Sequence, residues 1–298
     1  MSDLQGLSKV TLIKKRKSIL FRFFNCKKKK YMIECIKTYT KGEIMEVKRI
    51  TSAQNEYIKN LAKLKEKKHR EVQRLFIAEG EHLVEMALLS HFKIESIVLS
   101  DSYYEKYADK YNTDMVVVPD SLFLKFSDAK TPQGILAVIG LPENESADFS
   151  GKYIYCDNLQ DPGNVGTVIR TADAFSFSGV ILSAGSADVY SPKVIRSSQG
   201  SLFNIKVITG KDISYIKEAK KNGVFITSTA LYGESVRLCD MKVADNQIFV
   251  IGNEGSGVSK EILEISDEVA YIPMTGKAES LNAGVAASIL MYEVKTRE

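Results

Sequence analysis

The sequence predicts an α/β protein with a small N-terminal α/β domain and a C-terminal α/β domain built on a parallel sheet. Three observations indicate this. The chain has 298 residues, more than the roughly 100–200 of a usual single domain. Short apolar runs alternate with helical stretches in two separate series. A polar stretch at residues 143–151 separates these series and reads as a linker. We therefore expect domains at residues 45–142 and 152–298.

Residues 1–44 differ in charge from everything that follows. They hold 12 Lys/Arg and 3 Asp/Glu, a net charge of +9, whereas the other 254 residues carry 29 basic and 34 acidic side chains, a net charge of −5. We expect a disordered basic extension here. It is either a tail that contacts RNA phosphates or a stretch upstream of a natural start at Met45. Because the remainder is slightly acidic, net charge gives no argument for a nucleic-acid partner.

Two kinds of protein are disfavoured by composition. No apolar run approaches the roughly 18 residues that cross a bilayer, so we expect no membrane partner. The four cysteines are scattered without a CxxC pair, which predicts neither a metal site nor a disulfide framework. A reducing, cytoplasmic location fits this pattern best.

The first domain is predicted to open with a helix after Gln54, in which Ile58, Leu61 and Leu64 recur at spacings of three. Thr51 or Ser52 is its expected N-cap, and its exposed face is expected to carry a basic run from Lys59 to Arg70. Strands follow at Leu75–Ala78, Ile94–Leu99, Met115–Val118 and Ile135–Ile139, with helices at Glu81–Leu89 and Ser102–Lys110.

The second domain repeats the alternation, which is typical of a parallel sheet covered on both faces. Its predicted strands are Tyr153–Cys156, Gly179–Leu182, Ile205–Ile208, Val224–Ser228, Ile248–Ile251 and Val269–Ile272. Its predicted helices are Val165–Ala174, Pro192–Ser198, Ile213–Lys221, Ser259–Ile265 and Asn282 to about Lys295.

Three loops of the second domain each follow a predicted strand, and parallel sheets bind ligands at the carboxyl ends of their strands. The first loop leads through Pro162 and Gly163 into a helix that carries Arg170, with Asn164 as a possible cap. A cap and a salt-bridged arginine would explain this loop without any chemistry, and that alternative stays open for the loop alone.

The second and third loops are rich in small residues. Residues 252–257 have the spacing GxxGxG, which lets the backbone approach a ligand but lacks the GxGxxG order of a dinucleotide site. A nucleotide-binding oxidoreductase is therefore disfavoured. In the third loop, Ser280 and Asn282 stand at the entry of a helix whose small residues predict very close packing. Capping and turn formation again explain part of this pattern.

Together the loops resemble the three motifs of the SpoU/TrmH family of RNA ribose 2′-O-methyltransferases, in the SPOUT superfamily. The matching stretches are Asn158–Arg170, Gly252–Gly257, and Ile272–Met274 with Ser280–Asn282. Residues 76–84 are similar to the substrate-binding domain that precedes the catalytic domain in the ribosomal-RNA members. One departure is Ala283-Gly284, where many members carry Val-Ser.

The resemblance implies a C-terminal trefoil knot, a homodimer, S-adenosylmethionine as cofactor and RNA, most often ribosomal RNA, as partner. It implies an RNA substrate-binding role for residues 45–142 and a methyltransferase role for residues 152–298. The implied catalytic positions are Asn164, Arg170, Glu254, Ser280 and Asn282, and the implied cofactor-binding positions are Thr229, Ala230, Gly252, Ile272 and Leu281.

The expected reaction is methyl transfer to a ribose 2′-hydroxyl of RNA, and the expected substrate is 23S ribosomal RNA. All three histidines lie in the first domain, so a histidine base is not expected. We expect Arg170 to bind the target phosphate and stabilise the developing alkoxide, because an arginine does not give up its proton. The alternatives are a tRNA ribose methyltransferase and a catalytically silent RNA-binding protein.

Overall fold

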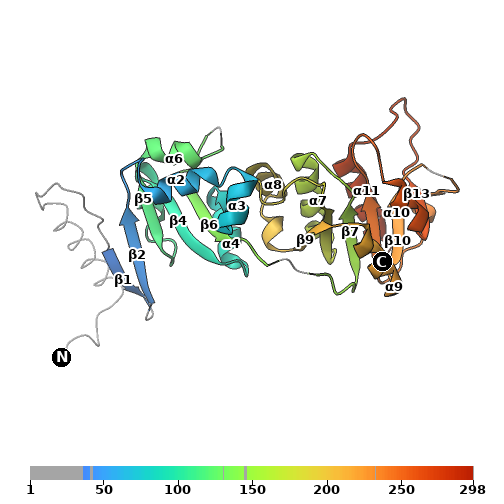
Figure 1. Ribbon diagram of the computed structural model, residues 1–298, viewed down its shortest axis with the longest axis horizontal. Coiled ribbons are helices and arrows are strands. Elements are labelled where there is room, and N and C mark those ends of the chain that lie inside the picture. Colours follow the sequence, from blue (N-terminus) through green and yellow to red (C-terminus); the bar gives the residue numbers. More distant parts are fainter. Residues whose placement is uncertain (1–35, 41–42, 130, 144–145, 232, 298) are drawn as a thin grey trace, which may run out of the picture. The chain divides into compact units, whose positions relative to one another are not determined.

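The computed structural model describes residues 36–40, 43–129, 131–143, 146–231 and 233–297, and residues 35–298 form one compact unit. Two sheets with covering helices follow one another along this unit (Figure 1). The predicted α/β class, a small N-terminal domain before a parallel-sheet domain, is confirmed. None of the helices in the described ranges is long and apolar enough to cross a membrane.

The N-terminal half contains six strands and five helices among the described residues. They are β1 (Ile36–Thr40), β2 (Glu43–Arg49), α2 (Glu56–Lys63), α3 (Lys67–Gln73), β3 (Leu75–Glu79), α4 (Glu81–Leu89), β4 (Ile94–Ser100), α5 (Asp101–Tyr107), β5 (Met115–Val118), α6 (Asp120–Phe126) and β6 (Ile135–Gly140).

The C-terminal half begins at β7 (Lys152–Cys156). It continues with α7 (Pro162–Ala174), β8 (Gly179–Ser183), α8 (Pro192–Ser198), β9 (Lys206–Lys211), α9 (Ile213–Lys221), β10 (Phe225–Thr229), β11 (Val236–Arg237), β12 (Gln247–Ile251), α10 (Lys260–Ile265), β13 (Glu268–Tyr271) and α11 (Ala283–Thr296). Two 3₁₀ turns lie at Ser201–Phe203 and Leu238–Asp240.

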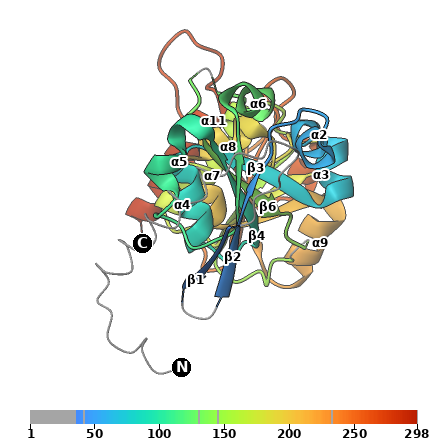
Figure 2. The same cartoon turned by 90° about the vertical axis from the view of Figure 1, so that its left-hand side faces the viewer.

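The first sheet is mixed, with the strand order β1-β2-β5-β4-β6-β3. β2, β5 and β4 are parallel, whereas β6 is antiparallel to β4 and β3. Neighbouring side chains of β4 point to opposite faces, so that Ile97 and Leu99 pack in one core and Val98 in another with Ile58 of α2. Figure 2 shows α4 and α5 on one side of these strands and α2 and α3 on the other.

The second sheet has the order β11-β13-β10-β12-β7-β8-β9, and its paired strands are all parallel. β8 and β12 are buried along their whole length. Both faces are covered, because Ile154 of β7 packs in the core with residues of α7 and α11, while Tyr155 packs in the core with residues of α9 and α10. Since the strands run in one direction, their carboxyl ends share one edge of the sheet.

The start of the first helical region differs from the prediction. It forms two helices, α2 and α3, and Asn55 caps α2 by accepting a hydrogen bond from the Tyr57 N–H at 2.9 Å. The prediction of Thr51 or Ser52 as the cap is wrong, because the helix begins only at Glu56 and its cap must directly precede the first turn. Ser52 instead accepts a hydrogen bond from the Gln54 N–H at 3.2 Å.

The N-terminal boundary also differs. β1 lies wholly within the predicted disordered extension, and β2 begins at Glu43, before the predicted boundary at residue 44. The lysine clusters determined that prediction, whereas IKTYT in β1 carries the β-branched and aromatic residues that favour a strand. Residues 1–35 lie outside the described residues. Both interpretations of the basic tail concern these residues and stay predictions.

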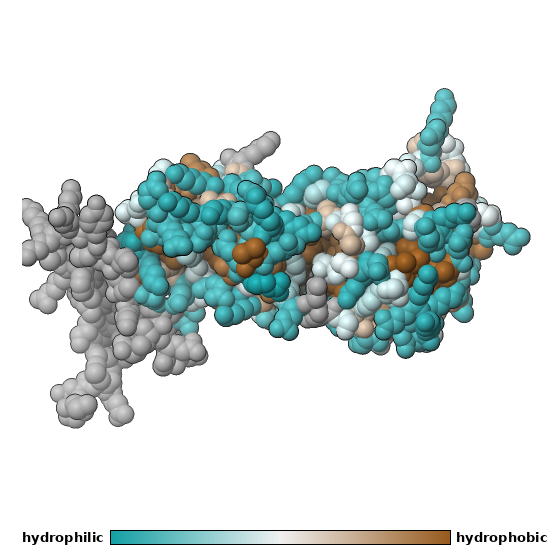
Figure 3. Space-filling view, in the orientation of Figure 1, coloured by the Kyte–Doolittle hydropathy of each residue, from teal (hydrophilic) through white to brown (hydrophobic). Residues whose placement is uncertain are grey.

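The two halves are joined by side-chain packing. One core cluster contains Phe76 and Val84 of the first half together with Leu202 and Phe203 of the second. Within the predicted linker, the Ala147 N–H donates to the hydroxyl of Tyr215 at 2.6 Å. Away from this core, the face seen in Figure 3 is mostly hydrophilic, with small separate hydrophobic areas.

Candidate functional site

The motif loops gather at the carboxyl edge of the second sheet. Cys156 pairs with Ile251 in the parallel register, so the loops after β7 and β12 leave the sheet side by side. β10 lies between β12 and β13, and its last residue, Thr229, pairs with Ala270. Parallel sheets bind ligands at this edge. Predicted site residues that are distant in sequence are therefore neighbours here.

Asp161 caps α7. The helix begins at Pro162, and Oδ1 of Asp161 accepts a hydrogen bond from the Asn164 N–H at 3.0 Å. The prediction of Asn164 as the cap is wrong, because Pro162 has no N–H to satisfy and is suited to the first helical position. Asn164 instead lies buried in the first turn, where its side chain is used for another purpose.

Asn164 is the middle member of a hydrogen-bonded chain of three side chains. Its Nδ2 donates to Oε1 of Glu254 at 2.9 Å, and its Oδ1 accepts from Nδ2 of Asn282 at 2.9 Å. Oδ1 of Asn282 accepts from the Val285 N–H at 3.1 Å and so caps α11. A carboxylate can only accept, so Glu254 determines how both amides are oriented. The three motif loops are thus held together by one residue from each.

Glu254 carries the charge of this chain. It also accepts hydrogen bonds from the backbone N–H groups of Gln160 at 3.3 Å and Asp161 at 3.1 Å. Partial burial raises the pKa of Glu254, but the hydrogen bonds from Asn164 and the backbone outweigh it and hold this pKa below the ordinary glutamate value. Glu254 is therefore ionised at neutral pH, with its oxygens occupied, which suits positioning better than proton transfer.

The second loop closes on itself. Asn253 and Gly257 exchange two backbone hydrogen bonds of 2.9 Å, and Oδ1 of Asn253 accepts from the Gly255 N–H at 2.9 Å. A Cβ on Gly252 would lie 2.1 Å from the carbonyl carbon of Gly257. Glycine at 252 is therefore required for backbone to approach backbone within the loop. This contact within the loop explains the glycine at position 252 without the predicted close approach of a ligand.

The third loop is open to solvent. Residues 273–282 are all exposed, including Ser280 and Leu281. No backbone hydrogen bond links residues 273–281 to another described residue, so their amide and carbonyl groups are available to a ligand. Ser280 likewise has no hydrogen bond to a described residue and does not join the chain formed by Asn164, Glu254 and Asn282.

Thr229 is the last residue of β10 and Ala230 follows it, between the loops that carry Gly252 and Ile272. Oγ1 of Thr229 donates to the Val250 carbonyl at 2.9 Å, and the Ala230 N–H donates to the Ala270 carbonyl at 3.1 Å. These bonds hold the end of β10 to both of its neighbouring strands.

Arg170 lies outside the hydrogen-bonded chain. It follows Asn164 by six residues on α7, a distance of about 9 Å along the helix axis. Its side chain is exposed and has no hydrogen-bond or ion-pair partner among the described residues. Within the described chain, the structure therefore brings together three of the five predicted catalytic residues, and leaves Arg170 and Ser280 apart from them.

The small residues of α11 pack closely on α7, as predicted. A Cβ on Gly284 would lie 3.2 Å from the Thr167 side chain and 3.3 Å from Oδ1 of Asn164. One turn further, the hydroxyls of Thr171 and Ser288 are 3.1 Å apart. Because the two helices pack closely, Asn282 at the start of α11 lies within hydrogen-bond distance of Asn164.

Known proteins match both halves of the chain. Residues 151–292 match the SpoU rRNA Methylase family, and residues 55–137 match the MRM3-like substrate binding domain. The chain is 38% identical over 249 residues to the 23S rRNA (guanosine(2553)-2′-O)-methyltransferase RlmP of Bacillus subtilis (strain 168), covering 84% of this chain and 100% of that protein. The chain belongs to the SpoU family.

Solved structures share the SpoU fold over most of the chain. An AdoMet-bound rRNA methyltransferase from Sinorhizobium meliloti has a TM-score of 0.75 at 30% identity, covering 84% of this chain and 98% of that one. An RNA 2′-O ribose methyltransferase structure has a TM-score of 0.71 at 29% identity, with the same coverage.

Sequence reasoning gave no role to two residues that hold the loops of this SpoU site, although Asn158 begins the first matching motif. Asp157 is 4% exposed, and its Oδ2 accepts from the Ser259 N–H at 2.7 Å. Asn158 has a φ of 54°, in the left-handed region that asparagine tolerates, and its N–H donates to the Ser183 hydroxyl at 2.8 Å. A signal was present, because polar residues directly follow the buried strand β7.

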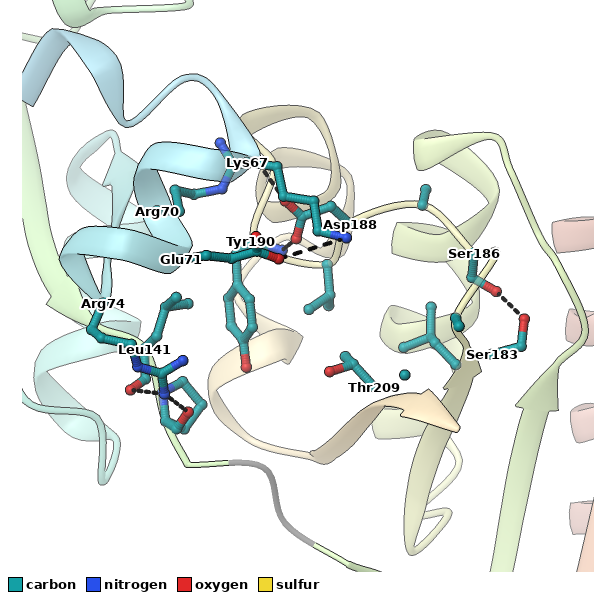
Figure 4. Close-up of a pocket in the computed structure, with 16 residues that line it drawn as sticks. Lys67, Arg70, Glu71, Arg74, Leu141, Ser183, Ser186, Asp188, Tyr190 and Thr209 are labelled. Carbon is teal, nitrogen blue, oxygen red and sulfur yellow. Dashed lines mark hydrogen bonds and ion pairs between the residues drawn. The ribbon is translucent and has the colours of Figure 1, made fainter. Parts of the chain in front are cut away.

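Arg70 joins the two halves of the SpoU chain. It was predicted on an exposed basic face, and this is wrong: it is only 3% exposed. Its Nη1 donates to the carbonyls of Leu64 at 2.7 Å and Lys65 at 2.8 Å, and its Nη2 forms an ion pair with Asp188 of the second half. Figure 4 shows the ion-paired residues beside a cavity of about 320 Å³ lined by residues of both halves. Helical periodicity could not reveal a partner 118 residues away.

Proposed function

We propose that this SpoU protein transfers a methyl group from S-adenosylmethionine to a ribose 2′-hydroxyl of ribosomal RNA, and that the substrate is 23S rRNA. The observation that carries the proposal is the chain Asn282–Asn164–Glu254, which joins three motif loops at the ligand-binding edge. The Bacillus subtilis relative is a 23S rRNA 2′-O-methyltransferase, and the chain covers its whole length. The match of residues 55–137 to a substrate binding domain favours rRNA over tRNA.

The loops at this edge fit S-adenosylmethionine. The bound cofactor supplies a methyl group that is already electrophilic. The free backbone groups of residues 273–281 can hydrogen-bond an adenine edge, as a purine with donor and acceptor groups requires. The residues assigned to the adenosine part are Thr229, Ala230, Gly252, Ile272 and Leu281.

The side chains of the site mainly position the reacting ribose. Asn164, Glu254 and Asn282 hold the loops in register. Arg170, whose guanidinium has no partner among the described residues, binds the phosphate of the target nucleotide and stabilises the developing alkoxide. Because arginine keeps its proton at neutral pH, the hydroxyl proton passes to water, late in the methyl transfer. Ser280 supplies a further hydroxyl at the entry of α11.

The first half, assigned to residues 45–142, docks the RNA. Its exposed lysines, such as Lys59 and Lys63 on α2, lie on one helix face and can contact phosphates. Because the halves share a core, deleting the first half would expose Phe203 and its neighbours. Its role is therefore better tested by surface substitutions than by deletion.

We further infer that two copies of the chain associate through α11. Val285 (46% exposed), Ile289 (37%) and Tyr292 (58%) recur at helical spacing and form an exposed apolar stripe along α11. A twofold axis would place the same stripe of a second copy against it. Light scattering should give twice 33.2 kDa, and Ile289→Glu should halve the measured mass. A monomeric wild type contradicts this.

The trefoil knot and a cytoplasmic location stay predictions.

The reaction is tested with purified protein, labelled S-adenosylmethionine and transcripts of 23S rRNA segments. Label should enter one segment, and alkaline hydrolysis should leave one protected phosphodiester there. Asn282→Ala should lower the methylation rate, because it removes both the cap of α11 and the bond to Asn164. If the protein binds rRNA but neither binds the cofactor nor labels RNA, it is the silent binder.

A further inference from the structure

A second cavity lies where the carboxyl end of α8 meets the start of α4. Its volume is about 220 Å³, and its lining includes Gly80, His82, Gln133, Arg196 and Gln199. This is smaller than the roughly 300–1,000 Å³ of sites for drug-sized ligands. It is a space for a single small ring system, and residues of both halves form it.

Gln133 and Gln199 each use one side-chain amide atom in a hydrogen bond within the protein. The other amide atom of each has no partner among the described residues. Oε1 of Gln133 accepts from the Glu81 N–H at 2.9 Å, and its amide N–H groups have no partner among the described residues. Nε2 of Gln199 donates to the Arg196 carbonyl at 2.9 Å, and its Oε1 has no partner among these residues. The cavity therefore offers preoriented neutral donors and an acceptor.

The backbone around the cavity is unusual. Gln199 has a φ of 50°, a conformation that side-chain-bearing residues rarely adopt, and Gly80 and Gly200 have φ values of 107° and 92°. The Gln199 carbonyl in turn meets Nε2 of His82 at 3.1 Å. Backbone held in such conformations is found at ligand-binding positions. These contacts present the Gln199 side chain to the cavity.

α8 connects this cavity to the reaction site. At its first turn, Nζ of Lys193 bonds Oδ2 of Asp161, the residue that caps α7 beside Asn164, at 3.2 Å. Arg196 follows one turn later, about 4.5 Å along the axis, and pairs with Asp128 at 3.0 Å. The helix α8 therefore spans from the Asp161 cap beside the reaction site to the cavity, and each of its two cations is paired with a carboxylate.

Charge and size favour a nucleobase as the occupant. Arg196 is compensated by Asp128, and Glu79 accepts hydrogen bonds from Ser127 and the Asp128 N–H, so among the described lining residues no lysine or arginine is left unpaired for an anion. Neutral amide groups suit the hydrogen-bonding edge of a base. Proteins recognise RNA sequence through unpaired bases turned out of the stack.

We propose that this cavity binds an unpaired base of the RNA substrate, close to the methylated nucleotide, and reads it through the side-chain amide N–H groups of Gln133 and the side-chain Oε1 of Gln199. The backbone between this base and the target runs along α8, past Lys193 and Arg196. The inference rests on the proposed function, because it takes the substrate to be rRNA. It makes the junction of the two halves a specificity site.

The test is Gln133→Glu, which keeps the acceptor for the Glu81 N–H but removes the amide donors. Gln73→Glu is the matched control, since Gln73 lies in the first half outside the cavity and donates weakly to the Asn60 carbonyl at 3.4 Å. Both variants are compared for KM and kcat on the labelled 23S segment, for cofactor affinity, and for equilibrium affinity for the same RNA. Gln133→Met, which keeps the length without polar atoms, is a second variant.

Gln133→Glu and Gln133→Met should raise KM and the RNA dissociation constant about tenfold, the size expected for a lost base contact. The kcat, the cofactor affinity and all values for Gln73→Glu should stay unchanged. Unchanged RNA affinity in both Gln133 variants overturns the cavity proposal while methylation by the wild type upholds the function. If the wild type methylates no rRNA, the function fails, and the RNA-affinity measurement alone decides the cavity.

Discussion

Glu254 shows how much of the site depends on a single charge. Glu254→Gln keeps the volume, but its NH₂ group would take the place of one oxygen. In the better orientation it faces the Gln160 N–H, which bonds Oε2, and the amide oxygen keeps the donors of Asn164 and Asp161, which bond Oε1. We expect the free energy of unfolding at pH 7 to fall by about 1 kcal/mol, a modest value because the residue is partly exposed. Urea unfolding measures this, and cofactor affinity should fall with it.

The same variant should lose its effect in acid. Because folding lowers the pKa of Glu254, its contribution to stability is complete above the ordinary glutamate pKa of about 4.3 and is lost as the pH falls through the folded value. The stability difference between wild type and Glu254→Gln should therefore shrink below about pH 4. A difference that is constant from pH 7 to pH 3 would show that charge is not the cause.

Arg170 is expected to act through its planar fork. Arg170→Lys keeps the charge but loses bidentate contact with a phosphate, so we expect kcat to fall at least about tenfold. Arg297→Lys, at the far end of α11, is the control and should change nothing. Near-normal turnover of Arg170→Lys would mean that a point charge suffices.

At the scale of elements, α7 packs so closely on α8 that a methyl group does not fit at Gly166. A Cβ on Gly166 would lie 2.1 Å from Oγ and 3.0 Å from the backbone carbon of Ser197. Gly166→Ala should therefore cost about 1–3 kcal/mol of unfolding free energy. Gly276→Ala meets nothing within 4 Å and should leave stability within about 0.5 kcal/mol of the wild type. Equal effects would indicate that α8 moves freely away.

Elements whose pattern is local could be predicted from the sequence. Met115–Val118 and Ile213–Lys221 have the predicted bounds, since an apolar run or a helical period is contained in each. Asp120–Phe126 was not predicted, although Phe123 and Phe126 are buried at a helical spacing of three. The gathering of the motif loops also followed from the sequence, because parallel strands end at one edge.

Contacts made across the fold could not be predicted in this way. Asn164 was placed in the site but given the wrong capping role, because Asp161 competes for the same position three residues earlier. Arg70 looked like one more exposed cation, since its partner Asp188 belongs to the other half. Which polar atoms form hydrogen bonds and ion pairs depends on the tertiary structure. The hydrophobic periodicity of the sequence does not specify these pairs.

At the scale of the whole molecule, Arg70 links the two halves through a buried ion pair with Asp188. Arg70→Met would remove the donor to the Leu64 and Lys65 carbonyls and the cation paired with Oδ2 of Asp188. Breaking a buried ion pair typically costs about 3–5 kcal/mol. Lys67→Met on the same helix removes only an exposed pair with Glu71 and should cost less than about 1 kcal/mol. Urea unfolding compares them, and similar losses for both would show that Arg70 is not a link.

The chain from Glu254 through Asn164 to Asn282 also sets an order in time. Its members are separated by 90 and 118 residues along the chain. A chain is made from its N-terminus, so Asn164 emerges first, then Glu254, and Asn282 at the start of α11 emerges last. The bond between Glu254 and Asn164 can therefore form before α11 packs onto α7. The contact of Asn282 with Asn164 completes the site last.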